Sequence, residues 1–306
     1  MKSIVITGAS GYLGQELLKK LSDAYEDYEI FALFSNNPIN QFKDNIIPIK
    51  VNLSKAHEYH KLPLKFDKLI HLAGDKRTFL SGEQGIKQFE YNLNLTKLIV
   101  KYLKNSNCNS IVFASSVYIY SGTSNTPFDE DNITMPNDYL GLSKLASELF
   151  LKSHTLRDNL KTICLRIFTT YGAQLNNKQF VSNSIHRLRS NSRKETFFNP
   201  HIHRDFIHIN DVVMAFVKSL NFLNKKDETY FNSINVATGK STTIKDLIME
   251  LVDFTDTNKE VEFAHGSHYT NDTDHFANIK KMNSIFNWSP KIKLSHGLGE
   301  LLKSNG

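Results

Sequence analysis

The sequence contains only two cysteines and no long apolar run. Cys108 and Cys164 are too few for a disulfide framework and lack the CxxC spacing of zinc sites, so we expect two reduced thiols and a cytoplasmic location. No stretch of about 18 consecutive apolar residues is present, which argues against a membrane-spanning helix. The N-terminal residues also lack the pattern of a cleavable signal peptide. We therefore expect neither a membrane partner nor an oxidising compartment.

Charge of one sign is not concentrated in any part of the chain. The 37 Lys and Arg residues exceed the 31 Asp and Glu residues, for a net charge of +6, but the basic residues are spread along the whole sequence. A nucleic-acid surface gathers its cations into one patch, so we expect no nucleic-acid partner. The 12 histidines form no recognised ligand spacing such as HExxH, and we predict no metal site.

Strand and helix signals alternate through the first half of the chain. The 306 residues suggest two domains or one large α/β domain. Short apolar runs predict strands at 3–7, 29–34, 46–51, 68–72, 110–114 and 161–168. Helical spacing of leucines and isoleucines predicts helices from residue 13, over 89–103 and from about residue 140. Such alternation is typical of a doubly wound parallel sheet.

The regular alternation ends after residue 168. Residues 171–200 are polar and are predicted to be rich in loops. Further elements are predicted as a strand at 204–209, a helix at 212–223, a strand at 232–236 and a helix at 244–254. We expect these later segments to form a smaller, discontinuous C-terminal α/β lobe that covers a substrate.

Three glycines lie between the first strand and the first helix. Gly8, Gly11 and Gly14 have GxxGxxG spacing within the sequence TGASGYLG. Gly8 permits a tight turn, Gly11 lets the backbone approach a pyrophosphate at the helix N-terminus, and Gly14 lets the helix pack on the strand. The placement predicts a dinucleotide-binding domain made of residues 1–169 and about 204–237, which leaves about 170–203 and 238–306 for the substrate lobe.

The end of the second strand does not distinguish NAD from NADP. An acidic residue there rejects a 2′-phosphate on the ribose, and an arginine accepts it. This chain has Ser35 and Asn36 after Phe34, and neither type of residue is present. A hydroxyl or an amide bonds equally well to a ribose hydroxyl or to a phosphate, so both cofactors stay open.

A series of short motifs extends over the chain in a fixed order. After the glycines come HLAG at 71–74, SS at 115–116, YLGLSK at 139–144, LRIF at 165–168, YG at 171–172, RDF at 204–206 with Asp211, and WSP at 288–290 with Gly297. Together these motifs resemble the extended short-chain dehydrogenase/reductase family, and they are most similar to its nucleotide-sugar epimerases, dehydratases and 4-ketoreductases. The resemblance covers essentially the whole chain. It implies a Rossmann-type fold, NAD or NADP, a nucleotide-diphosphate sugar as substrate, and a homodimer.

The resemblance also assigns roles to individual residues. Ser116 matches the hydroxyl that holds the sugar oxygen, and Lys144 matches the lysine that binds the nicotinamide ribose and lowers the pKa of a catalytic tyrosine. Arg204 resembles the arginine that pairs with the substrate diphosphate, and Thr169 stands where many epimerases have an asparagine. Two alternatives stay open, because Ser116 is also suited to cap a turn and Arg204 to form a surface ion pair with Asp205.

The residue four before Lys144 departs from the family pattern. It is Leu140, whereas the family has a tyrosine, and Tyr139 lies one residue out of register. Helical residues five apart differ by about 140° in direction, so Tyr139 and Lys144 share a face only if the helix start is distorted. Tyr118, which the resemblance directs towards the sugar, is a second candidate for proton transfer. Two explanations remain for the missing tyrosine. Either another group or solvent transfers the proton, or the protein binds its ligands without turnover.

The resemblance implies a 4-epimerase or a 4-ketoreductase that transfers a hydride at C4 of a nucleotide-activated sugar. Family dehydratases carry an acidic pair directly after the hydroxyl, where this chain has Val117 and Tyr118, which argues against 4,6-dehydration. The alternative is a catalytically impaired or non-catalytic protein that binds the same ligands. The predicted cofactor-binding residues are Gly8, Ser10, Gly11, Tyr12, Leu13, Gly14, Ser35, Asn52, Leu72, Ala73, Gly74 and Lys144.

Overall fold

The computed structural model describes residues 2–39, 43–78, 80–123, 125–172, 179–266 and 273–303. The chain divides into two compact units. The first contains Met1–Tyr120, Thr134–Arg166 and Val213–Ile234, and the second contains Ser121–Ile133, Ile167–Val212 and Asn235–Gly306. The domain boundaries that we predicted after residues 169, 203 and 237 stay a prediction.

The main sheet has seven strands in the order β11-β6-β5-β4-β1-β2-β3. They are β1 Lys2–Thr7, β2 Tyr28–Phe34, β3 Ile46–Lys50, β4 Lys68–His71, β5 Ser110–Ser116, β6 Lys161–Ile167 and β11 Tyr230–Val236. The pairs β1–β2, β2–β3, β1–β4 and β4–β5 run parallel. The predicted doubly wound parallel sheet is confirmed. The strand order reverses between β1 and β4, and ligands of such sheets bind at the carboxyl ends of the strands at this switch point.

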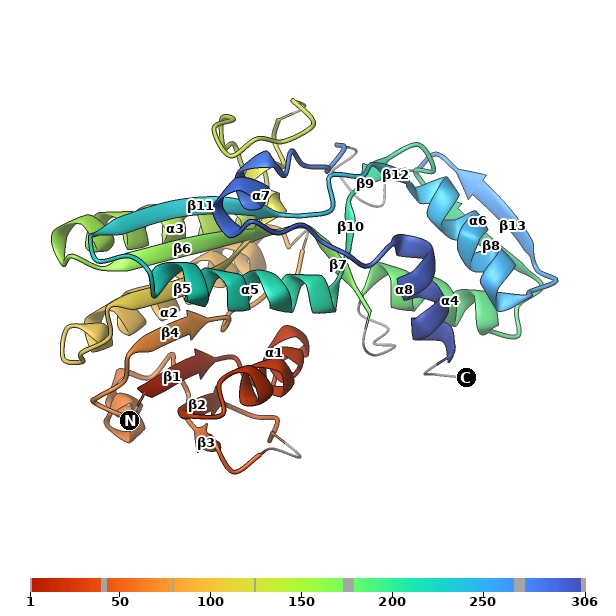
Figure 1. Cartoon of the computed structure of the whole chain (residues 1–306). Helices are drawn as coiled ribbons and strands as arrows, with labels where there is room; N and C mark the ends of the chain where they lie inside the picture. The colour runs from red at the N-terminus through yellow and green to blue at the C-terminus, as the bar shows by residue number, and fades with distance from the viewer. Residues whose placement is uncertain are drawn as a thin grey trace. The chain divides into compact units, whose positions relative to one another are not determined.

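Helices cover both faces of this sheet. They are α1 Tyr12–Ala24, α2 Gly82–Leu103, α3 Tyr139–Arg157 and α5 Ile209–Leu223, and two 3-10 turns, η1 Ala56–Lys61 and η2 Val117–Tyr120, follow β3 and β5. Figure 1 shows α1 and α5 on the near face of the sheet, with α2 and α3 behind it. A buried core joins β1 and β5 to α2 and α3 through Val5, Phe113, Leu95 and Leu151, among others. Burial of these apolar side chains holds the layers together.

Helix α2 begins seven residues before the predicted start at residue 89. Its first two turns, GEQGIKQ, carry a single large apolar residue, so leucine spacing gives no helical signal there.

The second unit contains short strands and a separate helical core. Its strands are β7 Thr169–Tyr171, β8 Lys194–Phe198, β9 His203–Arg204, β10 Phe206–His208, β12 Thr242–Thr243 and β13 Glu260–Ala264. They pair as β7–β10, β9–β12 and β8–β13. Its helices are α4 Phe180–Arg189, α6 Ile244–Thr255, α7 Lys280–Phe286 and α8 Leu294–Lys303. Val181, Ile185 and Leu188 of α4 pack with Leu247 and Leu298 in the core of this unit.

Two predictions for the second unit are wrong in detail. Residues 180–198 are not mainly loop, because α4 and β8 lie there; the three buried apolar residues of α4 are separated by polar ones, which hid the helix. The strand predicted at 204–209 is divided into β9 and β10 at Asp205, whose carboxylate accepts hydrogen bonds from the Thr238 and Gly239 amides. Over the described residues, no helix has the length and apolar character needed to cross a membrane.

Candidate functional site

The glycine turn between β1 and α1 requires glycine at positions 8 and 14, and it leaves little space for a side chain at position 11. Gly8 has a positive φ of 69°, and a Cβ there would lie 2.9 Å from the Ala73 amide nitrogen. A Cβ on Gly11 would lie 3.2 Å from the Gly8 carbonyl oxygen, and one on Gly14 would collide with the same oxygen. Gly11 occupies the N-cap position of α1 and has no side chain that could shield the helix N-terminus, whose partial positive charge favours an anion. These residues therefore fit the pyrophosphate of a dinucleotide.

The residues after β4 lie beside this glycine turn. The Thr7 Oγ1 accepts hydrogen bonds from the Leu72 and Ala73 amides, each at 3.1 Å, and is 2.8 Å from the Nδ1 of His71. The Ala9 amide donates to the carbonyl of Leu33 in β2 at 3.0 Å. The structure thus brings together the glycine turn, the turn after β4 and the end of β2.

Lys144 lies on α3 at the carboxyl end of β5. Its Nζ donates to the Ala114 carbonyl at 2.8 Å and is 4.8 Å from the centre of the Phe113 ring. The same nitrogen is 3.7 Å from the place that a Cβ on Gly74 would occupy. Burial lowers the pKa of Lys144 to about 8, against the opposing effect of the Glu148 carboxylate. The ammonium is therefore mostly charged at neutral pH and loses its charge as the pH rises through about 8.

Ser116 and Tyr118 lie at the end of β5 and in η2. The Ser116 Oγ accepts a hydrogen bond from the Tyr118 amide at 3.3 Å, so this hydroxyl does cap the turn. Both side chains are half-buried. A Cβ on Gly141 would collide with the Tyr118 carbonyl, which shows how closely η2 approaches the start of α3. The hydroxyl of Ser116, the ring of Tyr118 and helix α3 thus belong to one corner of the first unit.

Helix α3 starts with regular geometry at Tyr139. The Asp138 side chain caps the helix by accepting from the Gly141 amide at 2.6 Å. The Tyr139 ring packs on α2 where Gly85 has no side chain, because a Cβ on Gly85 would overlap the ring. Leu140, at the family's tyrosine position, is 5% exposed. The structure therefore puts an apolar side chain four residues before Lys144 and packs the neighbouring phenol ring against α2.

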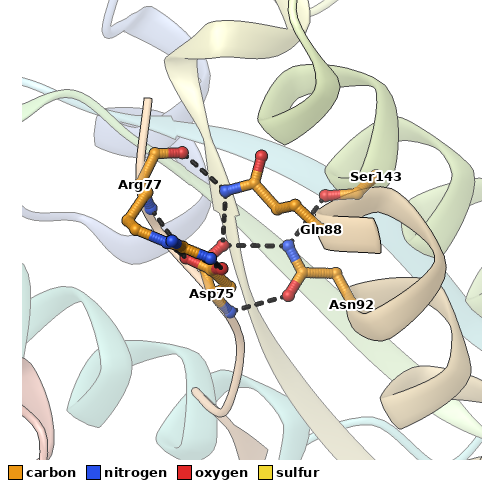
Figure 2. A network of polar contacts seen from close by, with 5 residues as sticks. All are labelled: Asp75, Arg77, Gln88, Asn92 and Ser143. Atoms are coloured by element: carbon orange, nitrogen blue, oxygen red, sulfur yellow. Dashed lines mark hydrogen bonds and ion pairs between the residues drawn. The ribbon is translucent and has the colours of Figure 1, made fainter. Parts of the chain in front are cut away.

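A polar network that the sequence analysis missed holds the loop after β4 (Figure 2). The Asn92 Nδ2 donates to the Asp75 carbonyl at 2.9 Å and to the Ser143 Oγ at 3.0 Å, while its Oδ1 accepts from the Asp75 amide at 2.7 Å. Gln88 donates to the Arg77 carbonyl at 2.6 Å. These contacts attach the loop to α2 and α2 to α3, next to Lys144. The sequence signal was the spacing of four between Gln88, Asn92 and Thr96, which puts these polar residues on the buried face of α2.

Lys76 is a second residue that the sequence analysis missed. Its Nζ lies 5.6 Å from the centre of the Tyr12 ring, and Tyr12 is the first residue of α1. A cation beside this helix start adds to the positive potential of the helix N-terminus. The predicted Ser10 and Leu13 flank Tyr12, and the Ser10 carbonyl accepts from Gln15 at 2.9 Å.

The ends of β2 and β3 carry the remaining predicted cofactor residues. Ser35 is exposed directly after β2. The Asn52 Oδ1 accepts from the Ser54 amide at 3.0 Å, and the Asn52 amide donates to the Glu58 carboxylate at 2.9 Å. This amide and Lys61 lower the pKa of Glu58 to about 2. The Asn52 side chain is thus engaged in its own loop.

Thr169 and Arg204 belong to the second unit. Thr169 pairs with Phe206 between β7 and β10. The Arg204 guanidinium donates to the His203 carbonyl at 2.9 Å and to the Thr273 carbonyl at 2.7 Å. Asp205 is fully buried, and burial raises its pKa. The alternative prediction of a surface ion pair between Arg204 and Asp205 is therefore wrong, because Asp205 does not lie on the surface. The hydrogen bonds that hold Asp205 come from Thr238 and Gly239, as described above.

No group of three or more His, Cys, Asp or Glu residues with the geometry of a metal site occurs in the ranges that the structure describes. Both cysteines are buried free thiols.

Comparisons with known proteins agree with this geometry. A sequence profile of the NAD dependent epimerase/dehydratase family matches residues 4–237. The chain is 27% identical to the dTDP-4-dehydro-6-deoxyglucose reductase of Escherichia coli, over 98% of this chain and 96% of that protein.

Two solved structures show the same fold. One is a UDP-glucuronic acid 4-epimerase from Bacillus cereus in complex with UDP-4-deoxy-4-fluoro-glucuronic acid and NAD; its TM-score is 0.87 at 20% identity, with 99% of this chain and 100% of that chain covered. The other is RMD from Pseudomonas aeruginosa complexed with NADPH, with a TM-score of 0.82 at 19% identity and coverage of 99% and 98%.

Proposed function

We infer that this chain, which belongs to the NAD dependent epimerase/dehydratase family, transfers a hydride at C4 of a nucleotide-diphosphate sugar, as a 4-epimerase or a 4-ketoreductase. The observation that carries this proposal is the position of Lys144. Its Nζ lies against Ala114 and Gly74, at the carboxyl ends of β5 and β4, in the same unit as the glycine turn. A buried cation at this edge of the sheet suits the ribose end of a dinucleotide whose pyrophosphate lies on α1.

In the proposed complex the first unit holds NAD or NADP. The amides of the glycine turn bind the pyrophosphate, with Lys76 as an additional cation, and Lys144 binds the nicotinamide ribose. When bound, the nicotinamide supplies or accepts the hydride. Ser35 and Asn36 take the adenosine ribose, and they leave the choice between NAD and NADP open.

The substrate side of the proposal uses four residues. The Ser116 hydroxyl orients the sugar oxygen at C4, and the Lys144 ammonium favours negative charge developing on that oxygen. Arg204 binds the diphosphate, since its planar set of donors suits phosphate oxygens. Thr169, which pairs with Phe206 two residues after Arg204, contributes a hydroxyl.

We assign proton transfer to one of two half-buried phenols, because Leu140 carries no exchangeable proton. A positioned acid or base contributes about 10²- to 10⁴-fold to the rate. Tyr118→Phe and Tyr139→Phe remove one hydroxyl each and keep the aromatic ring, which in Tyr139 packs on Gly85. We expect kcat to fall by at least about 10²-fold in one variant and to stay within about threefold in the other. Steady-state rates of the two variants identify the tyrosine that transfers the proton. If neither rate falls, both tyrosines are excluded from this role.

The test of the proposed reaction is transfer of deuterium from a reduced cofactor labelled on the nicotinamide C4. Purified protein is mixed with labelled NADH or NADPH and a panel of 4-keto UDP-, GDP-, CDP- and dTDP-sugars, and in parallel with NAD and the corresponding 4-hydroxyl sugars. Products are analysed by mass spectrometry and NMR. A 4-ketoreductase puts deuterium on C4 with stoichiometric oxidation of the cofactor. A 4-epimerase instead inverts C4 of the hydroxyl sugar with catalytic NAD. Absence of both changes across the panel contradicts the proposal.

A second candidate function rests on the buried side chain of Leu140. A protein that keeps the dinucleotide cradle and Lys144 but lacks the acid binds NAD(P) and a nucleotide sugar without turnover. Binding without deuterium transfer would support this candidate.

We further propose that the protein is a cytoplasmic homodimer that pairs through α3. Leu142, Leu149 and Leu156 recur every seven residues along this helix and are 41%, 59% and 60% exposed. Residues seven apart share a helix face, so the three form one apolar stripe suited to a second copy. Leu149→Glu puts a charge in the centre of the stripe and is expected to shift dimer to monomer, as measured by sedimentation equilibrium. A wild-type monomer, or a variant that stays dimeric, would contradict this interface.

A further inference from the structure

Three polar groups lie within hydrogen-bonding distance of the Thr7 hydroxyl. Its oxygen has two lone pairs and one proton. The Ala73 amide donates to it at 3.1 Å, and the Leu72 amide is shared between it at 3.1 Å and the Thr7 carbonyl at 3.3 Å, so both lone pairs face a donor. The remaining neighbour is the Nδ1 of His71 at 2.8 Å. The hydroxyl proton therefore points to this nitrogen, and the hydroxyl is held in one orientation.

This arrangement determines the state of the His71 ring. A ring nitrogen that accepts a hydrogen bond from a hydroxyl carries no proton itself. Nδ1 is therefore the acceptor, and Nε2 carries the ring proton. The ring is 1% exposed, and the Nε2 atom is buried without a hydrogen-bond partner among the described residues. Burial, together with the charge of Lys144, lowers the pKa of His71 to about 3. The ring is thus neutral at physiological pH.

The Thr7 bonds act on the glycine turn. Thr7 directly precedes Gly8, and a Cβ on Gly8 would lie 2.9 Å from the Ala73 nitrogen and 3.0 Å from its Cα. The two turns are therefore in contact, and the amides that Thr7 binds belong to the residues that Gly8 touches. A change in the orientation of the hydroxyl would move Leu72 and Ala73 relative to Gly8.

We propose that His71, as the neutral Nε2–H tautomer, is a positioning residue that orients the Thr7 hydroxyl and so holds the glycine turn against Ala73 in the geometry that receives the cofactor pyrophosphate. The role rests on the dinucleotide site proposed above. His71 touches neither substrate nor reacting atoms in this account; it acts through Thr7.

The tautomer is tested without any cofactor. Long-range ¹H–¹⁵N NMR spectra of histidine-labelled protein separate protonated from unprotonated ring nitrogens, and the signals missing from His71→Asn assign His71. We expect an unprotonated Nδ1 and a protonated Nε2 whose shifts stay constant between about pH 5 and 8, since the ring does not titrate in that range. The opposite tautomer, or a ring that titrates in this range, would overturn the proposal.

The positioning role is tested by affinity for NADH and NADPH, measured by fluorescence. His71→Leu removes the acceptor and should raise Kd by about 10-fold or more, whereas the side-chain oxygen of His71→Asn replaces Nδ1 and should keep Kd within about threefold. Thr7→Val and Thr7→Ser form a second pair. Thr7→Val removes the hydroxyl and should raise Kd, whereas Thr7→Ser keeps the hydroxyl and should keep Kd close to that of wild type. The control variant is Thr162→Val, which also removes a buried hydroxyl. It breaks the 2.6 Å hydrogen bond with Thr155 at the amino end of β6. It should lower stability and leave Kd unchanged.

The outcomes separate the two proposals. If wild type binds dinucleotide and His71→Leu binds it as tightly, the positioning role is overturned and the proposed function stands. If His71→Leu does not fold, Thr7→Val against Thr7→Ser and the tautomer spectra decide. A wild-type protein that binds neither NADH nor NADPH overturns the proposed function and the positioning role together, whatever the tautomer.

Discussion

Lys144→Met is expected to lower turnover by about 10²-fold or more. The substitution keeps a similar buried volume but removes the ammonium group that donates to the Ala114 carbonyl at 2.8 Å, at the carboxyl end of β5. Loss of one preorganised electrostatic group at an active site costs roughly 10²- to 10³-fold in kcat. The control is Lys152→Met, which removes an exposed lysine two turns later on the same helix. Initial rates of both variants at saturating cofactor test the prediction, and equal rates would contradict it.

The same residue predicts a pH dependence. The pKa of Lys144 is about 8, below its ordinary value, because burial disfavours the ammonium. Below pH 8 the side chain is charged; as pH rises through about 8 the charge is lost, so turnover and affinity for the cofactor should both fall. Lys144→Arg keeps the charge at every accessible pH and should remove this alkaline decline from whatever activity remains. A wild-type profile that stays flat between pH 7 and 9 would contradict the assignment.

Arg166→Met is expected to destabilise the protein by about 3–5 kcal/mol, because it leaves a buried carboxylate without its partner. Arg166 and Glu148 have 7% and 4% exposed side chains, and the closest pair of atoms is 2.9 Å apart. The arginine also donates to the Tyr120 hydroxyl at 2.6 Å, and Ser233 donates to Glu148 at 2.9 Å. Loss of the arginine therefore removes the ion pair of this glutamate.

Urea unfolding measures the effect. The matched control is Lys87→Met, which breaks an exposed pair with Glu83 on α2 and should not change stability measurably. An Arg166→Met variant that loses less than about 1 kcal/mol would show that Glu148 finds other partners or takes up a proton. Because Tyr120 ends η2, the variant should also loosen the turn that carries Tyr118.

The parts of the fold that were predictable are those whose signal is local. The glycine spacing at 8, 11 and 14 and the apolar runs of β1, β4 and β5 depend on neighbouring residues only, so the dinucleotide cradle and the parallel sheet were predicted. Helix α4 and the first turns of α2 were missed because their buried residues are few and separated by polar ones. In such segments tertiary packing decides the structure, and periodicity is weak.

The site residues also differ in whether their positions could be predicted from local sequence. Positions of Ser116 and Lys144 followed from motif order, and both lie at the end of β5 and on α3 as expected. Three features depend on contacts between distant segments, and local patterns do not specify the partners in these contacts. These are the packing of Tyr139 on Gly85, the attachment of the Asp75 loop to Asn92, and the burial of Asp205 by Thr238. Each joins residues more than 15 positions apart, so no window of sequence contains both partners.

The central claim is that this chain carries out hydride transfer and does not merely bind a dinucleotide. The most direct test is the absorbance of the reduced nicotinamide band when purified protein is mixed with NAD⁺ or NADP⁺ and a panel of UDP-, GDP-, CDP- and dTDP-sugars, repeated with Leu140→Tyr. The account predicts that wild type forms reduced cofactor with at least one sugar, and that Leu140→Tyr does so with the same sugar. A signal that arises only with Leu140→Tyr would contradict it and identify the native chain as a binding protein.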